Sequence, residues 1–136
     1  MREILLDTPR GRLAALRHGP AGAPPVLALH GWLDNAASFL PLLPHLPDID
    51  LVALDLPGHG HSYHRPPGAE YGLIDYLLDI DAAFDALGWA RGRLLGHSLG
   101  GALATLYAAA APERVERLAL IEALGPLAGT PGGALS

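Results

Sequence analysis

Short apolar runs alternate with longer amphipathic or polar segments along this chain, which is the pattern of an α/β protein. Runs in which every residue is apolar are typical of parallel strands that are buried on both faces of a sheet. The first two runs flank a Pro-Arg-Gly turn and predict an N-terminal hairpin. The expected strands are residues 4–6, 13–16, 26–29, 51–54, 93–95 and 118–121.

Three helices are expected between the strands. Residues 71–87 form the clearest one, because their apolar side chains recur at helical spacing and Gly88 follows as a stop. A short helix is expected over 36–46, with Asp34 or Asn35 as its cap and Pro41 limiting its regularity. The run of Ala, Leu and Gly over 101–111 predicts a buried helix.

Four aspartates, Asp75, Asp79, Asp81 and Asp85, fall in the helix expected over 71–87, and we expect them on its solvated face rather than around a metal ion. Strands that alternate with helices predict a mostly parallel sheet with helices on both faces. We find no internal repeat and no linker, so residues 1–136 are expected to form one domain.

Composition narrows the class of protein. Half of the 136 residues are hydrophobic and 17% are charged, which indicates a globular chain. The net charge of −5 argues against nucleic acid or an anionic membrane as a partner. Cysteine is absent, which excludes disulfides and cysteine metal sites. No apolar run is long enough for a secretion signal or a membrane span, so we expect a cytoplasmic protein.

The most specific motif is the pentapeptide Gly96-His97-Ser98-Leu99-Gly100, which lies between an expected strand and an expected helix. This is the G-x-S-x-G pattern of a nucleophile elbow in its proper strand–turn–helix context. The serine of such an elbow stands on a strained turn, and glycines on both sides avoid collisions with neighbouring backbone. The helix N-terminus behind Ser98 adds partial positive charge where an oxyanion would develop.

Two further motifs precede the elbow. His30-Gly31-Trp32 ends one expected strand, and residues 55–62 (Asp-Leu-Pro-Gly-His-Gly-His-Ser) end the next. In this order the three motifs resemble the N-terminal half, through the sixth strand, of the α/β-hydrolase superfamily. Residues 30–39 resemble serine-hydrolase-like members of its epoxide hydrolase and dehalogenase branch. Relatives in that branch use an aspartate nucleophile, so Ser98 departs from them and favours acyl chemistry.

The resemblance implies a role for each site residue. Ser98 would attack an acyl carbon, and the backbone N–H groups of Leu99 and Trp32 would form the oxyanion hole. The triad acid of most relatives follows a seventh strand that this chain does not reach. Some relatives place the acid after the sixth strand, and Glu122 occupies that position here. The alternative for Glu122 is a solvent-facing residue at a strand end.

The histidines are expected to have structural roles. His30 should brace the oxyanion turn, and His97 should point away from the Ser98 hydroxyl. His59, His61 and His64 form an H-x-H-x-x-H pattern, but Tyr63 occupies the place of the carboxylate that a familiar metal site would need. We therefore expect no metal and no cofactor. Asp55 is expected to accept hydrogen bonds from nearby backbone.

The chain contains no candidate for the base of a serine hydrolase. In this fold the histidine follows the serine and the acid along the chain, and all seven histidines precede Ser98. We therefore expect a partial domain of a serine hydrolase for a small ester or similar acyl substrate, inactive by itself. The alternative is a non-catalytic ligand-binding protein of the same fold. A cofactor-free haloperoxidase or a carbon–carbon bond hydrolase would use the same triad.

The 136-residue chain alone should hydrolyse p-nitrophenyl acetate no faster than a trace rate, because a serine without an imidazole partner is a weak nucleophile. Spectrophotometric turnover of purified chain measures this. Turnover at ordinary enzyme rates that disappears in Ser98→Ala would contradict the expectation.

Overall fold

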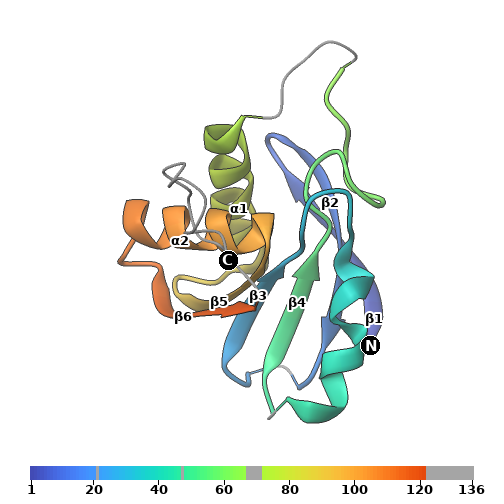
Figure 1. Ribbon diagram of the computed structural model, residues 1–136, viewed down its shortest axis with the longest axis vertical. Coiled ribbons are helices and arrows are strands. Elements are labelled where there is room, and N and C mark those ends of the chain that lie inside the picture. The colour runs from blue at the N-terminus through green and yellow to red at the C-terminus, as the bar shows by residue number, and fades with distance from the viewer. Residues whose placement is uncertain (21, 47, 67–71, 122–136) are drawn as a thin grey trace, which may run out of the picture.

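The computed structural model describes residues 1–20, 22–46, 48–66 and 72–121. Six strands form one sheet in the order β1-β2-β4-β3-β5-β6 (Figure 1). β2 pairs antiparallel with both β1 and β4, whereas β4, β3, β5 and β6 run parallel. The strand bounds are β1 Arg2–Thr8, β2 Gly11–His18, β3 Pro25–Leu29, β4 Asp50–Leu54, β5 Gly92–His97 and β6 Val115–Ile121.

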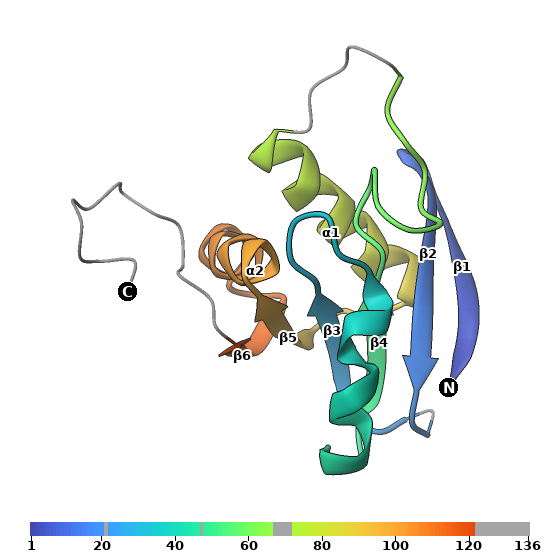
Figure 2. The same ribbon diagram turned by 45° about the vertical axis from the view of Figure 1, so that its right-hand side comes forward.

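Helices cover both faces of this sheet, as the sequence predicts. The 3-10 helix η1 (Ala36–His45) packs on one face, and α1 (Leu73–Leu87) and α2 (Leu99–Ala110) pack on the other (Figure 2). The placement follows from right-handed crossovers. The chain steps from β3 to β4 through η1, and then travels the opposite way across the sheet through α1 and α2.

Two apolar layers result. The larger one lies between the sheet and the two α-helices and includes Phe84, Ile80 and Leu103. The smaller one lies under η1 around Phe39. β4 is buried along its whole length, as expected for a strand whose residues 51–54 are all apolar. Its single charged residue, Asp50, is buried against the guanidinium of Arg17, with contacts of 2.6 and 2.9 Å.

The segment 36–46 forms a 3-10 helix rather than an α-helix. Pro41 and Pro44 lie inside it and cannot donate the backbone bonds that an α-helix requires. Asn35 is its cap, and the Asn35 side chain accepts a hydrogen bond from the Ala37 N–H at 2.9 Å. One of the two caps that the sequence offered is therefore correct.

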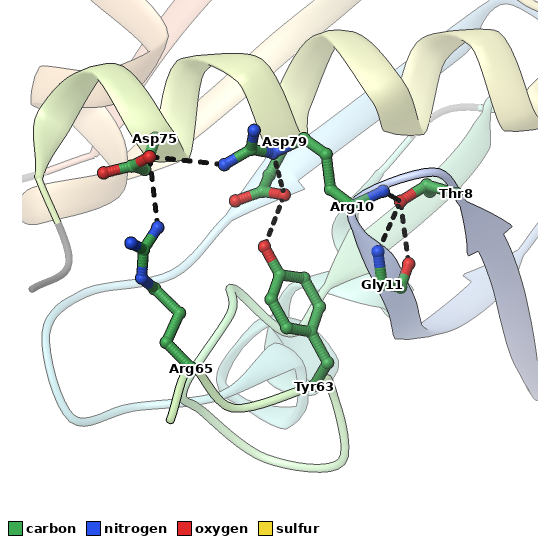
Figure 3. A network of polar contacts seen from close by, with 7 residues as sticks. All are labelled: Thr8, Arg10, Gly11, Tyr63, Arg65, Asp75 and Asp79. Carbon is green, nitrogen blue, oxygen red and sulfur yellow. Dashed lines mark hydrogen bonds and ion pairs between the residues drawn. The ribbon is translucent and has the colours of Figure 1, made fainter. Parts of the chain in front are cut away.

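The expectation that all four helix aspartates face solvent is wrong for Asp79. This carboxylate is 1% exposed and accepts hydrogen bonds from Arg10 Nε and from the Tyr63 hydroxyl, both at 2.8 Å (Figure 3). Arg10 comes from the β1–β2 turn, and Tyr63 from the loop after β4. Burial first, and then the bond to Asp79, raise the pKa of Tyr63 to about 12, so the phenol remains a donor at neutral pH.

The same network continues to the start of α1. Asp75 contacts Arg10 at 3.4 Å and Arg65 at 3.1 Å (Figure 3). A hairpin turn, a loop and a helix that are distant in sequence are thus joined through two carboxylates. Only the sheet topology brings Arg10 within reach of the helix, so helical periodicity alone could not reveal this arrangement.

β6 is the outer strand at one edge of the sheet in the described part of the chain. Its five central residues are exposed, and three of them, Leu118, Ala119 and Leu120, are apolar. An unpaired edge with apolar side chains is a template for pairing with another strand. No helix among the described residues is long and apolar enough to cross a bilayer.

We propose that the 136-residue chain self-associates through the β6 edge. Analytical ultracentrifugation should show dimers or larger species, and Leu118→Lys should shift them toward monomer because charge on an edge strand opposes pairing. Leu5→Lys, on the exposed face of β1 at the other edge, is the matched control and should leave the association unchanged. A stable monomer with the unmodified sequence would contradict the proposal.

Candidate active site

The candidate site lies where the connections that follow β3 and β5 leave the sheet toward opposite faces. The connection after β3 leaves toward one face, and the connection after the adjacent strand β5 leaves toward the other. Such a switch point opens a crevice at the carboxyl ends of parallel strands. His30-Gly31-Trp32 directly follows β3, and Ser98 directly follows β5. A β-carbon added to Gly31 would lie only 3.2 Å from the Ser98 β-carbon, so the two motifs are in contact.

Ser98 has the strained backbone that an elbow requires. Its φ is 55° and its ψ is −117°, a region that residues with a side chain rarely adopt. The neighbouring glycines are needed for close backbone approach. A β-carbon at Gly96 would lie 2.5 Å from the Gly100 carbonyl oxygen, and one at Gly100 would lie 2.0 Å from the Leu29 carbonyl oxygen.

The Ser98 hydroxyl is not used to cap α2, although Ser98 is the residue before the helix. The Ser98 carbonyl accepts the N–H groups of Gly101 and Ala102, while its side chain is exposed. Leu99 is the first residue of α2, so its N–H is one of the four that have no partner inside the helix. A hydroxyl and an N–H donor are therefore available side by side.

The second N–H of the predicted oxyanion hole lies on a tight turn after β3. The Asp34 N–H donates to the Gly31 carbonyl at 3.1 Å, and Leu33 between them has a φ of 59°. No described residue accepts a hydrogen bond from the Trp32 N–H. The Trp32 ring is 59% exposed and meets the His59 ring edge to face, with centroids 5.5 Å apart.

His30 has the structural role that the sequence predicts. It is fully buried, and its Nε2 accepts the Leu56 N–H at 2.9 Å. Its Nδ1 lies 2.7 Å from the carbonyl oxygen of the next residue, Gly31. Burial is the largest influence on this group and lowers the pKa of His30 below the ordinary histidine value. At neutral pH the ring is uncharged.

His59 was missed as a site residue by the sequence reasoning. Its Nε2 accepts the Leu33 N–H at 3.1 Å, and its Nδ1 lies 3.1 Å from the Pro57 carbonyl oxygen. Both ring nitrogens are thus occupied by backbone groups, whereas His61 and His64 are exposed. No group of three metal-ligating side chains is found in the described ranges.

Asp55 organises the loop after β4. Its carboxylate accepts the His61 N–H at 3.0 Å, as expected, and also the Ala36 N–H at the start of η1 at 2.7 Å. A β-carbon at Gly60, where φ is +49°, would lie 2.2 Å from one Asp55 oxygen. Glycine at this position lets the loop wrap around the carboxylate.

A cleft of about 200 Å³ lies beside the elbow, between η1 and the ends of β5 and β6. The Trp32 ring is not part of its wall. The lining residues are Ser38, Phe39, Pro41, Leu42, His97 and Ile121.

The structure thus places the turn that holds Gly31 and Trp32 against the elbow that holds Ser98 and Leu99. Glu122 lies outside the described residues. The last described residue before it, Ile121, pairs with His97 in the adjacent parallel strand, so β6 ends level with the elbow. The carboxylate role of Glu122 stays a prediction.

Comparison with known proteins agrees with this geometry. The family model of the alpha/beta hydrolase fold matches residues 24–132. A human "Serine hydrolase-like protein" is 45% identical over 121 residues, which cover 88% of this chain and 60% of that protein. The chain belongs to the α/β-hydrolase fold family.

Solved structures carry the same fold. A hypothetical protein from Pseudomonas aeruginosa PAO1 superposes with a TM-score of 0.89 at 51% identity, covering 96% of this chain and 46% of that one. A bacterial membrane phospholipase A superposes with a TM-score of 0.85 at 34% identity, covering 93% of this chain and 41% of that one. The chain therefore spans between 41% and 60% of the length of these three proteins.

Proposed function

We propose that the whole protein is a serine hydrolase that cleaves a small carboxylic ester or a similar acyl compound. The observation that carries this proposal is the contact between the two motifs, with Gly31 beside the exposed Ser98 on its strained turn. The human relative named as serine hydrolase-like supports the reaction class. The phospholipase A among the structural relatives supports ester chemistry by analogy.

The proposed reaction begins with attack of the Ser98 oxygen on the acyl carbon. The hydroxyl proton passes to a histidine of the whole protein that lies outside these 136 residues, because all seven histidines of this chain precede Ser98. The carbonyl oxygen of the substrate becomes an oxyanion. The N–H groups of Leu99 and Trp32 stabilise that oxyanion, and each such donor contributes roughly 3–4 kcal/mol to the transition state. The histidine then protonates the departing alcohol, and water releases the acid from Ser98 by the same steps.

The cleft beside the elbow supports a small acyl group. Its volume of about 200 Å³ is below the range of roughly 300–1,000 Å³ that is usual for pockets of drug-sized ligands. Its walls combine Phe39, Pro41 and Leu42 with the polar Ser38 and His97. The cytoplasmic location expected from the sequence stays part of the proposal.

The competing proposal is a binding protein that holds a ligand near Ser98 without turning it over. The cleft beside the elbow would serve such a protein as its ligand site. A fluorophosphonate probe separates the two, because only a hydroxyl held near a base and an oxyanion hole reacts quickly with such a reagent.

In the whole protein, Ser98 should be the serine that the fluorophosphonate labels, as located by mass spectrometry of tryptic peptides. Ser98→Ala should abolish labelling. Thr8→Ala, which removes a hydroxyl at the end of β1 and outside the cleft, is the matched control and should leave labelling at the normal rate. An active protein with no adduct on Ser98 would overturn the nucleophile assignment.

We further propose Glu122 as the triad acid, because it follows a strand that ends level with the elbow. Glu122→Gln should lower kcat by about 10⁴-fold without unfolding the protein, since the amide favours the wrong histidine tautomer. Glu116→Gln, on the exposed part of β6, should leave kcat unchanged. A near-normal kcat for Glu122→Gln, together with loss of activity on changing a later carboxylate, would assign the acid elsewhere.

A further inference from the structure

Two histidines join the turn after β3 to the loop after β4, and each of these two segments supplies one of them. His30, directly after β3, accepts the Leu56 N–H of the loop after β4. His59 belongs to the second segment and accepts the Leu33 N–H of the first. The two rings lie together, with centroids 4.9 Å apart. Each segment therefore supplies one imidazole to the backbone of the other.

The partners of the four ring nitrogens fix the protonation of both rings. A backbone carbonyl only accepts, so the Nδ1 atoms facing the Gly31 and Pro57 carbonyls must carry hydrogens. A backbone N–H only donates, so both Nε2 atoms must be bare. All four contacts are satisfied only when both imidazoles are neutral and hydrogenated on Nδ1.

The hydrogen bond from the Leu33 N–H to His59 Nε2 stabilises a backbone conformation of the turn that is otherwise unfavourable. Leu33 has a positive φ, which costs a residue with a side chain about 1–2 kcal/mol. Its side chain is 79% exposed, so burial of the leucine does not offset that cost. The Trp32 N–H shares its peptide unit with the Gly31 carbonyl. That carbonyl accepts the Asp34 N–H across Leu33 at 3.1 Å and lies 2.7 Å from His30 Nδ1, so the conformation of the turn at Leu33 helps to fix where the Trp32 N–H points.

We propose that His59 is a positioning residue for the oxyanion hole, and that with His30 it forms a clasp that aims the Trp32 N–H at the Ser98 crevice. This proposal rests on the proposed function, since it assigns the clasp to the oxyanion of that reaction. His59 touches neither Ser98 nor an acyl group in this role; it acts through the backbone of the turn.

Protonation should open the clasp. A proton on Nε2 of His59 places a donor against the Leu33 N–H, and the same change in His30 places one against the Leu56 N–H. Burial is the largest influence on His30 and lowers its pKa, whereas the carboxylates of Asp55 directly after β4 and of Asp34 in the turn raise it. Two charged rings 4.9 Å apart would also repel each other.

The direct test is NMR on the ¹⁵N-labelled whole protein, and its readout does not depend on activity. Couplings across the N–H···N hydrogen bonds should join the Leu33 nitrogen to His59 Nε2 and the Leu56 nitrogen to His30 Nε2. Both rings should show the tautomer with hydrogen on Nδ1, and both couplings should vanish on acidification. A His59 ring with hydrogen on Nε2 at neutral pH, or no coupling to Leu33, would overturn the clasp whatever the enzyme does.

The kinetic test uses the whole protein. His59→Leu removes the acceptor and should lower kcat by about 10- to 100-fold with KM nearly unchanged, less than the 10²- to 10³-fold loss of a whole oxyanion donor. His59→Gln restores an acceptor near the Nε2 position and should recover most of the rate.

His64→Leu is the matched control, because His64 is an exposed histidine of the same loop, and it should keep normal kinetics. Equal kcat in His59→Leu and His64→Leu would contradict a positioning role. If the fluorophosphonate fails to label Ser98 while the two couplings are present, the hydrolase proposal fails and the assignment of the clasp to an oxyanion fails with it. Absent couplings in a labelled, active protein refute the clasp alone.

Discussion

The close approach of the α2 N-terminus to strands β3 and β5 is the constraint on which the candidate site depends. The backbone of Gly100 lies so near the Leu29 carbonyl that a β-carbon would come within 2.0 Å of its oxygen. Helix and sheet can approach this closely only where no side chain intervenes. The connection between them is therefore short and sharp, and it gives Ser98 a positive φ and leaves it exposed.

A second layer of polar contacts holds the turns around that elbow. Backbone groups beyond the strand ends have no ladder partners, and buried ones must be satisfied by side chains. Asp55, His30 and His59 take up this role for the turn after β3 and the loop after β4. The loop is anchored in turn by Tyr63, whose hydroxyl donates to the buried Asp79 of α1. Contacts far from Ser98 thus help to fix its surroundings.

Local sequence patterns predicted what depends on local chemistry. The six strands and the elbow follow from apolar runs and glycine spacing, and the capping role of Asn35 follows from its side chain. Contacts made by tertiary packing could not be read in this way. In the sequence, Asp79 has the spacing of a residue on the solvated face of a helix. In the fold, the β1–β2 hairpin places Arg10 against it. In the sequence, His59 resembles part of a metal-binding motif. Its actual partner, the Leu33 N–H, comes from the turn after β3 and is brought to the ring only by the fold.

The central claim is that Ser98, Leu99 and Trp32 share one oxyanion site. A crystal structure of the whole protein phosphonylated on Ser98 tests it most directly, because the phosphonyl oxygen stands where the oxyanion of the reaction would form. The account predicts that this oxygen accepts hydrogen bonds from the N–H groups of Leu99 and Trp32 at about 2.7–3.1 Å. A phosphonyl oxygen bound to neither N–H, with the turn after β3 directed away from it, would contradict the account.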